Sequence, residues 1–437
     1  MTLIKKSMLI MAALVGLAAA ANAQRKQPNV VLIVIDTLRA DHLPFLGYKV
    51  DTAPFLTSLA ADSAVFTHAY AASSWTAPAT ASILTSLYPF QHGVTMGMLA
   101  TKELQKINPD IKINRIPDEI ETLPETLKAA GYTTYAITDN INICEAEGFH
   151  KGFDRFINHR YQGAETVAAE LKEWLPEIRA QERSFIYLHF NDPHQPLHER
   201  APWYVRRDSV REDMLAKYDS EIRYLDAHLK DLFTLFGWRE NTLVVVTADH
   251  GEEFWDHGGM GHGYSLYNEV IHVPLFFYLP GATRRGVVIN HTVSTLDVAP
   301  TVRAILGLPP GERDAGVNLL PVIATPKMVV DERTVFSHLL KTLPDGLESG
   351  ARAAVCQEWK VYNTYVGENQ STTYLFNLTA DPGEQENLYE TTLSFAQELI
   401  SRYHWFVKNC AKAGQEMVDY SLNEDEIEQL KSLGYIQ

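Results

Sequence analysis

The chain has 437 residues, of which 46% are hydrophobic, so it is long enough to bury a large core. Its formal net charge is −16 and it has no basic run, which argues against nucleic acid and anionic membrane as partners. An acidic protein repels anionic substrates as well, so binding one requires a local attraction, most simply a metal ion.

The first residues are typical of a secretory signal peptide. Two lysines precede an apolar stretch over residues 8–21, and small residues at Ala21 and Ala23 form a cleavage site. We expect removal of residues 1–23, which predicts an exported, periplasmic or secreted protein. A retained anchor is the alternative, but about 14 apolar residues are fewer than the ~20 that span a bilayer. We therefore expect no membrane span in the mature chain.

Three β-branched or apolar runs predict strands that are buried on both faces, as in a parallel sheet. They cover residues 29–35, 184–190 and 242–247. Helical patterns lie between them, over residues 123–130 and 163–179. Strands that alternate with helices predict an α/β domain with a large, mixed but mostly parallel sheet flanked by helices.

The last part of the chain changes character. Residues 352–365 and 372–378 are predicted to pair as a hairpin in a small antiparallel sheet, followed by a helix over residues 424–433. A turn signal near residue 345 predicts a boundary between a catalytic domain, residues 24–345, and a C-terminal subdomain, residues 346–437.

The cysteines are three in number and far apart in the sequence. Cys144, Cys356 and Cys410 therefore allow one disulfide at most and do not build a metal site. We expect them to be small, buried apolar residues.

Polar side chains follow the ends of the predicted strands, where α/β sheets place their sites. Asp36 follows the first strand, and Asp249 with His250 follows the third, so a carboxylate and an imidazole can hold one divalent ion. Two further histidines, His194 and His262, lie in Gly- or Pro-containing segments, where a surface histidine in a turn is the alternative interpretation.

Several motifs occur in the order found in the sulfatase family of the alkaline phosphatase superfamily, which the chain resembles over nearly all of its mature length. They are residues 28–36, the Trp75–Ser86 stretch, residues 87–93, Asp249-His250-Gly251-Glu252, residues 267–275, residues 296–301 and residues 375–388. The resemblance implies the alkaline phosphatase/sulfatase-like fold and an ester hydrolase.

The Trp75–Ser86 stretch departs from the sulfatase signature C/S-x-P-S-R-x-x-x-x-T-G at its reacting position. Thr76 stands in place of the cysteine or serine that becomes formylglycine, while Ala79 and Thr80 replace the serine and arginine. Oxidation of threonine would give a ketone, so we expect no formylglycine. A threonine hydroxyl can still attack directly when a metal or a base lowers its proton affinity.

The resemblance also implies the ligands. Asp36, Asp249 and His250 would hold a divalent cation together with Thr76. His194 and His262 would act on the ester group or hold a second metal, with Asp192 or His257 as further candidate ligands. An imidazole beside carboxylates favours zinc or manganese, and calcium less.

These observations predict an exported, metal-dependent hydrolase of sulfate or phosphate esters in which Thr76 is the nucleophile and His194 and His262 are catalytic. Its substrate would be a sulfated or phosphorylated small molecule, glycan or lipid. Two alternatives remain, an envelope phosphoethanolamine- or phosphoglycerol-type transferase and a non-catalytic glycan-binding homologue.

Overall fold

The structure is a computed structural model that describes residues 27–109, 111–281, 286–328, 333–343, 348–367, 370–391, 393–409 and 416–418. The expected signal peptide, residues 1–23, and the expected helix over residues 424–433 lie outside the described residues. Among the helices within those ranges, none combines the length and the apolar character that crossing a bilayer requires.

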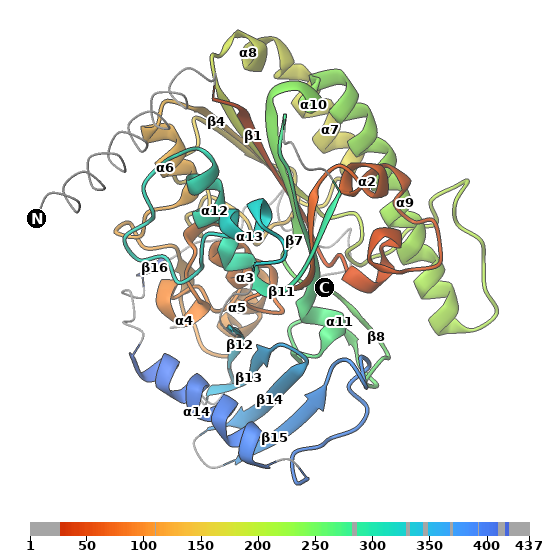
Figure 1. Ribbon diagram of the computed structural model, residues 1–437, viewed down its shortest axis with the longest axis vertical. Helices are drawn as coiled ribbons and strands as arrows, with labels where there is room; N and C mark the ends of the chain where they lie inside the picture. The colour runs from red at the N-terminus through yellow and green to blue at the C-terminus, as the bar shows by residue number, and fades with distance from the viewer. Residues whose placement is uncertain are drawn as a thin grey trace, which may run out of the picture.

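A large sheet of eight strands forms the centre of the catalytic domain, in the order β11-β2-β10-β7-β1-β6-β4-β5 (Figure 1). Every pairing in it is parallel except the two made by β10, which confirms the mixed, mostly parallel sheet. The strands are β1 (Asn29–Ile35), β2 (Ala64–Tyr70), β4 (Thr133–Thr138), β5 (Arg155–Asn158), β6 (Ser184–Phe190), β7 (Thr242–Ala248), β10 (His272–Tyr278) and β11 (Val287–Ser294).

Helices cover both faces of this sheet, because its central strands are apolar on both sides. Along β1, Ile33 and Ile35 join the cluster on one face, whereas Leu32 and Val34 join the cluster on the other. The first face is covered by α2 (Pro54–Ala60), α7 (Ala164–Glu173), α8 (Leu175–Ala180), α9 (Val210–Phe236) and α10 (Trp238–Asn241). The second is covered by α3 (Thr76–Thr85), α6 (Leu123–Ala129), α12 (Val298–Ile305) and α13 (Leu320–Ala324).

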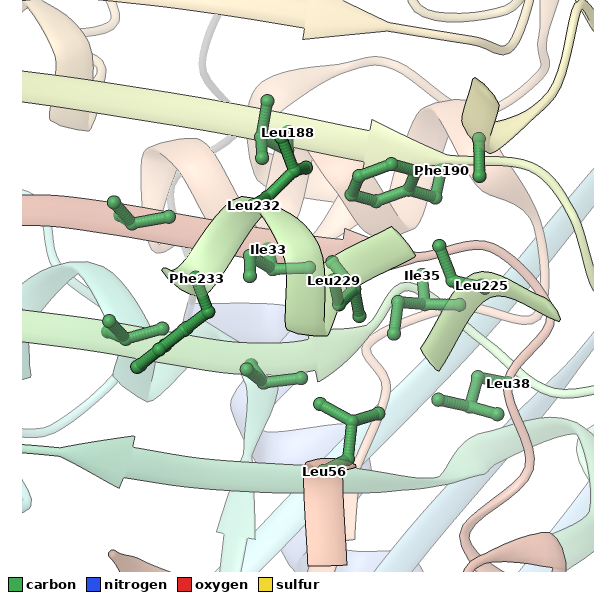
Figure 2. Packing of buried hydrophobic residues seen from close by; sticks show 14 of the residues in the cluster. Ile33, Ile35, Leu38, Leu56, Leu188, Phe190, Leu225, Leu229, Leu232 and Phe233 are labelled. Carbon is green, nitrogen blue, oxygen red and sulfur yellow. The ribbon is translucent and has the colours of Figure 1, made fainter. Parts of the chain in front are cut away.

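Figure 2 shows the first of these contacts, where Ile33 and Ile35 of β1 face Leu225 and Leu229 of α9. These four side chains are at most 2% exposed. Full burial of one such side chain is worth about 1.5–3 kcal/mol, so this layer fixes how the strands and the long helix stack.

A separate four-stranded antiparallel sheet lies at one end of the molecule (Figure 1). It contains β12 (Thr334–Thr342), β13 (Glu348–Cys356), β14 (Trp359–Val366) and β15 (Gln370–Asn377), and α14 (Leu393–Asn409) packs against it. The small elements are α4 (Pro89–His92), α5 (Met98–Gln105), α11 (Asn268–Ile271), the β3 (Ile113–Arg115) and β16 (Glu416–Val418) pair, and the β8 (Glu253–Phe254) and β9 (Met260–Gly261) pair.

Three sequence-based expectations are corrected. The helix expected over residues 163–179 is two helices, α7 and α8, which meet at Trp174 because Pro176 lacks the N–H that would continue α7. Residues 352–365 span two strands, since the chain turns back at Gln357, which adopts a left-handed φ of 54°. The small sheet already includes β12, so it begins before residue 345. Cys144 and Cys356 are buried, as expected, and Cys410 lies outside the described residues.

A buried ion pair joins the small sheet to the catalytic domain. Lys360 Nζ of β14 lies 2.7 Å from Glu384 Oε1, and both side chains are fully buried. The other carboxylate oxygen of Glu384 accepts a hydrogen bond of 2.6 Å from the backbone N–H of Asn268, at the start of α11. One carboxylate therefore holds elements from both parts of the chain.

We predict that Glu384→Gln lowers the free energy of unfolding by about 3–5 kcal/mol, because it leaves the Lys360 ammonium buried without a counter-charge. Arg402→Ala is the matched control, since its 2.6 Å pair with Glu398 is exposed and should change stability by less than about 1 kcal/mol. Chemical denaturation measures both values. Equal small losses in the two variants would contradict a stabilising role for the buried pair.

Candidate active site

The carboxyl ends of the parallel strands bring the predicted acidic residues together. Asp36 follows β1, and Asp249 and His250 follow the neighbouring strand β7, which pairs with β1 in register. One ligand atom from each of these three residues lies within 4.8 Å of the others. His250 Nε2 is 3.6 Å from Asp36 Oδ1 and 3.7 Å from Asp249 Oδ2.

This cluster fits a divalent cation on its own chemistry. Among the described residues, Asp36 Oδ1 and Asp249 Oδ2 are buried without a hydrogen-bond donor, although an unpaired buried carboxylate is costly. Burial and the charge of Asp249 raise the pKa of Asp36 to about 7. Burial acts in the same direction on Asp249, but His250 and His189 outweigh it and hold the pKa of that carboxyl below its ordinary value.

The other atoms of these three side chains are held by the protein. Asn140 Nδ2 donates to Asp36 Oδ2 at 2.6 Å, and the backbone N–H of His250 donates to Asp249 Oδ1 at 2.8 Å. His250 Nδ1 lies 2.9 Å from the carbonyl of Gly251, which places the imidazole proton on Nδ1 and leaves Nε2 unprotonated. Contacts of this kind orient metal ligands.

Thr76 lies at this cluster, as the first residue of α3. Its Oγ1 is 3.2 Å from His250 Nε2, and the residue is 1% exposed. The positive end of a helix dipole favours negative charge near such a terminus. The hydroxyl is therefore positioned beside the His250 imidazole, at a candidate cation site.

His194 and His262 complete a row of three imidazoles. The His262 ring centroid lies 4.4 Å from that of His250 and 5.0 Å from that of His194. Nδ1 of His262 is 3.1 Å from Glu252 Oε1, and Nδ1 of His194 is 2.5 Å from the carbonyl of Gln195. Burial lowers the pKa of each ring to about 4, so both are neutral near pH 7.

The structure does not bring Asp192 and His257 into this row. Asp192 Oδ1 accepts a hydrogen bond of 3.1 Å from the backbone N–H of Ala164, where it caps α7. His257 pairs with Glu269 at 2.6 Å and stacks on Tyr267 at 3.5 Å between ring centroids. Both candidate ligands of a second metal thus make structural contacts, although Asp192 Oδ2 is buried without a hydrogen-bond partner.

Sequence reasoning missed three residues at the site. His189 is fully buried in β6 with Nε2 3.5 Å from Asp249 Oδ2, and its position within an apolar strand was a usable signal. Asn140 follows β4 and holds Asp36. Lys341 of β12 lines a cavity together with His194 and His262, and nothing in its local sequence pointed there.

A hydroxyl and an imidazole thus lie at a cluster of buried acids, at the carboxyl edge of an α/β sheet. The sulfatase family model matches residues 28–308, which is more than half of the chain, so the protein belongs to the sulfatase family. A second family model, N-sulphoglucosamine sulphohydrolase, C-terminal, matches residues 257–407.

Similar proteins agree with this assignment. Arylsulfatase A from Homo sapiens is 25% identical, over 87% of this chain and 86% of the relative. The phosphonate monoester hydrolase of Agrobacterium radiobacter superposes with a TM-score of 0.69 at 17% identity, covering 92% of this chain and 99% of that one. A protein solved in complex with its substrate D-glucosamine-2-N,6-O-disulfate gives 0.70 at 16% identity, covering 88% and 98%.

We predict that Asp249→Ala and His250→Ala each lose the bound cation, because two remaining protein ligands are too few to retain it. Elemental analysis of purified protein should find zinc or manganese, and not calcium, in the unchanged chain. His257→Gln is the control and should keep its metal, since His257 contacts Glu269 instead. Equal metal content in all four proteins would contradict the assignment.

Proposed function

We propose that this sulfatase-family hydrolase is exported and metal-dependent, and that it cleaves anionic sulfate or phosphate esters with Thr76 as the nucleophile. The observation that carries the proposal is the 3.2 Å contact between Thr76 Oγ1 and His250 Nε2, beside the Asp36 and Asp249 carboxylates. Among the described residues, no other side-chain hydroxyl is hydrogen-bonded to Asp36, Asp249 or His250, which supports the choice of Thr76 as the attacking group.

Asp36, Asp249 and His250 would hold the cation, and two carboxylates with an imidazole suit zinc or manganese better than calcium. When bound, such an ion supplies positive charge that stabilises ester oxygens and lowers the proton affinity of a nearby hydroxyl. Asn140 and the Gly251 carbonyl keep the ligand atoms in place before substrate arrives.

In the proposed reaction, a bond forms from Thr76 Oγ1 to phosphorus or sulfur while the bond to the departing alcohol oxygen breaks. One of the neutral imidazoles of His194 and His262 accepts the hydroxyl proton and passes it to the alcohol. Water then cleaves the ester on Thr76 and restores the hydroxyl.

The nucleophile favours phosphate esters over sulfate esters. Water can attack phosphorus in a phospho-threonine, as in other phosphoenzymes. A sulfo-threonine has no second hydroxyl on the same carbon, so it cannot expel sulfate as the hydrated aldehyde of formylglycine does. The similarity of fold to a phosphonate monoester hydrolase is consistent with phosphorus chemistry on this scaffold.

We predict that Thr76→Ala reduces kcat by several orders of magnitude, whereas Thr76→Ser keeps measurable activity because it restores a hydroxyl. Thr85→Ala is the matched control, since Thr85 in the same helix bonds to the carbonyl of Ala81. Steady-state kinetics on an activated ester measures all three. Full activity of Thr76→Ala would remove Thr76 from the mechanism, and inactivity of every protein towards esters would favour a glycan-binding role.

We also predict a higher kcat/KM for an aryl phosphate than for the aryl sulfate with the same leaving group. The reason is that water can hydrolyse a phosphate ester on Thr76 by attack at phosphorus, whereas a sulfate ester on Thr76 lacks an equivalent route. Competition assays with both esters in one solution, where product release is followed chromatographically, measure the ratio. Sulfate turnover far above phosphate turnover would contradict the preference. Transfer of the acid group to an added alcohol in place of water would favour the transferase.

A further inference from the structure

A cavity of about 650 Å³ opens beside the row of imidazoles, within the usual size range of small-molecule sites. His194, His262 and Glu252 form the side of the cavity that adjoins the reacting groups. Apart from Glu103 and Gln195, its remaining wall is largely apolar and comes from the segments around α3, α5 and β9, through Trp75, Met96, Ala100, Leu104, Met260 and Tyr264.

One cation, Lys341, lines this cavity among the described residues. It comes from β12 of the small sheet, and its ammonium lies 4.0 Å from the ring centre of Tyr264 and 5.9 Å from that of Trp75. Within the described ranges no carboxylate pairs with it. The one exposed acid of the lining, Glu103, is itself paired with Lys106 at 2.7 Å.

The charge and the partial burial of the Lys341 ammonium favour binding of an anion. Burial lowers the pKa of Lys341 to about 8, so the ammonium is still mostly charged at neutral pH but has lost part of its hydration. A bound anion would offset that loss.

We propose that the cavity is the subsite for the alcohol part of the substrate, that it takes an apolar alcohol in preference to a polar sugar, and that Lys341 binds the charged oxygens of the ester. This inference rests on the proposed hydrolase site. The apolar wall offers few hydrogen-bond partners for sugar hydroxyls, and burying them unpaired is costly. The aromatic and sulfur-containing side chains gain most from contact with an apolar group.

The groups proposed to break the ester bond and the lysine proposed to bind the substrate come from different sheets. The Asp36 cluster comes from the large sheet, whereas Lys341 comes from the small sheet that lies at one end of the molecule (Figure 1). Gly263 allows the close approach that shapes the wall, because a Cβ at its left-handed φ of 70° would lie 3.3 Å from the Trp75 indole.

The test is binding to the Thr76→Ala protein, measured by calorimetry, so that turnover does not interfere. The probes are 3-phenylpropyl phosphate and glucose 6-phosphate, together with the two corresponding sulfates. For the phosphates, the sulfates or both, we expect the phenylpropyl ester to bind at least about tenfold more tightly than the matching sugar ester. Leu104→Asn with Met260→Gln should reduce that ratio, because it makes the wall polar.

Lys341→Met should weaken binding of the phenylpropyl ester by about tenfold or more but leave binding of neutral 3-phenylpropanol unchanged, whereas Lys341→Arg should bind the ester nearly as the parent does. Lys128→Met is the control, since Lys128 lies on α6 and pairs with Asp154. Sugar esters that bind as tightly as apolar ones, or unchanged ester binding in Lys341→Met, would overturn the inference. The proposed function would still stand if wild-type turnover depends on Thr76.

Discussion

Two buried carboxylates that face each other are the constraint on which the site depends. Asp36 and Asp249 approach because β1 and β7 pair in register and end at the same edge of the sheet. Their mutual repulsion and burial would destabilise the fold if nothing neutralised them. His250 and His189 lie 3.6 and 3.5 Å from these carboxylates on two sides, and a bound cation would offset the negative charge. The stability of the fold at this edge and the proposed binding of a cation therefore depend on the same pair of carboxylates.

Hydrogen bonds from the protein occupy one oxygen of each carboxylate and leave the other oxygen able to bind a cation. Asn140 occupies one oxygen of Asp36, and backbone N–H groups of Thr37 and His250 occupy one oxygen of Asp249. The same logic applies to the imidazoles of His194, His250 and His262, whose Nδ1 atoms all lie against protein oxygens. Because these partners are backbone groups or buried side chains, the geometry is fixed before any ligand binds.

The sequence was sufficient for the parts of the fold and site that depend on local pattern. The three apolar runs predicted β1, β6 and β7, and the residues directly after β1 and β7 form the cluster. It was insufficient where tertiary packing decides. The acid of Asp192 and the imidazole of His257 resemble ligands in the sequence, yet one caps α7 and the other pairs with Glu269. Lys341 is far from His194 in the sequence, and only folding shows that both line one cavity.

The small sheet is held firmly against the rest of the structure and contributes Lys341 to the cavity. Through Glu384 it is fixed to Lys360 within the sheet and to the backbone at Asn268, close to the segment that carries His262. A rigid junction of this kind is required if Lys341 is to hold its charge within reach of the reacting groups, because a subsite that moves by about 1 Å loses much of its effect. In this proposal, groups at the edge of the large sheet would determine which ester bond is cleaved. The small sheet, through Lys341, would help to determine which alcohol part of the substrate is accepted. With Thr76 as the proposed nucleophile, the first of these properties would differ from that of an enzyme that uses formylglycine, and the second would be free to differ from that of the protein of similar fold solved with D-glucosamine-2-N,6-O-disulfate.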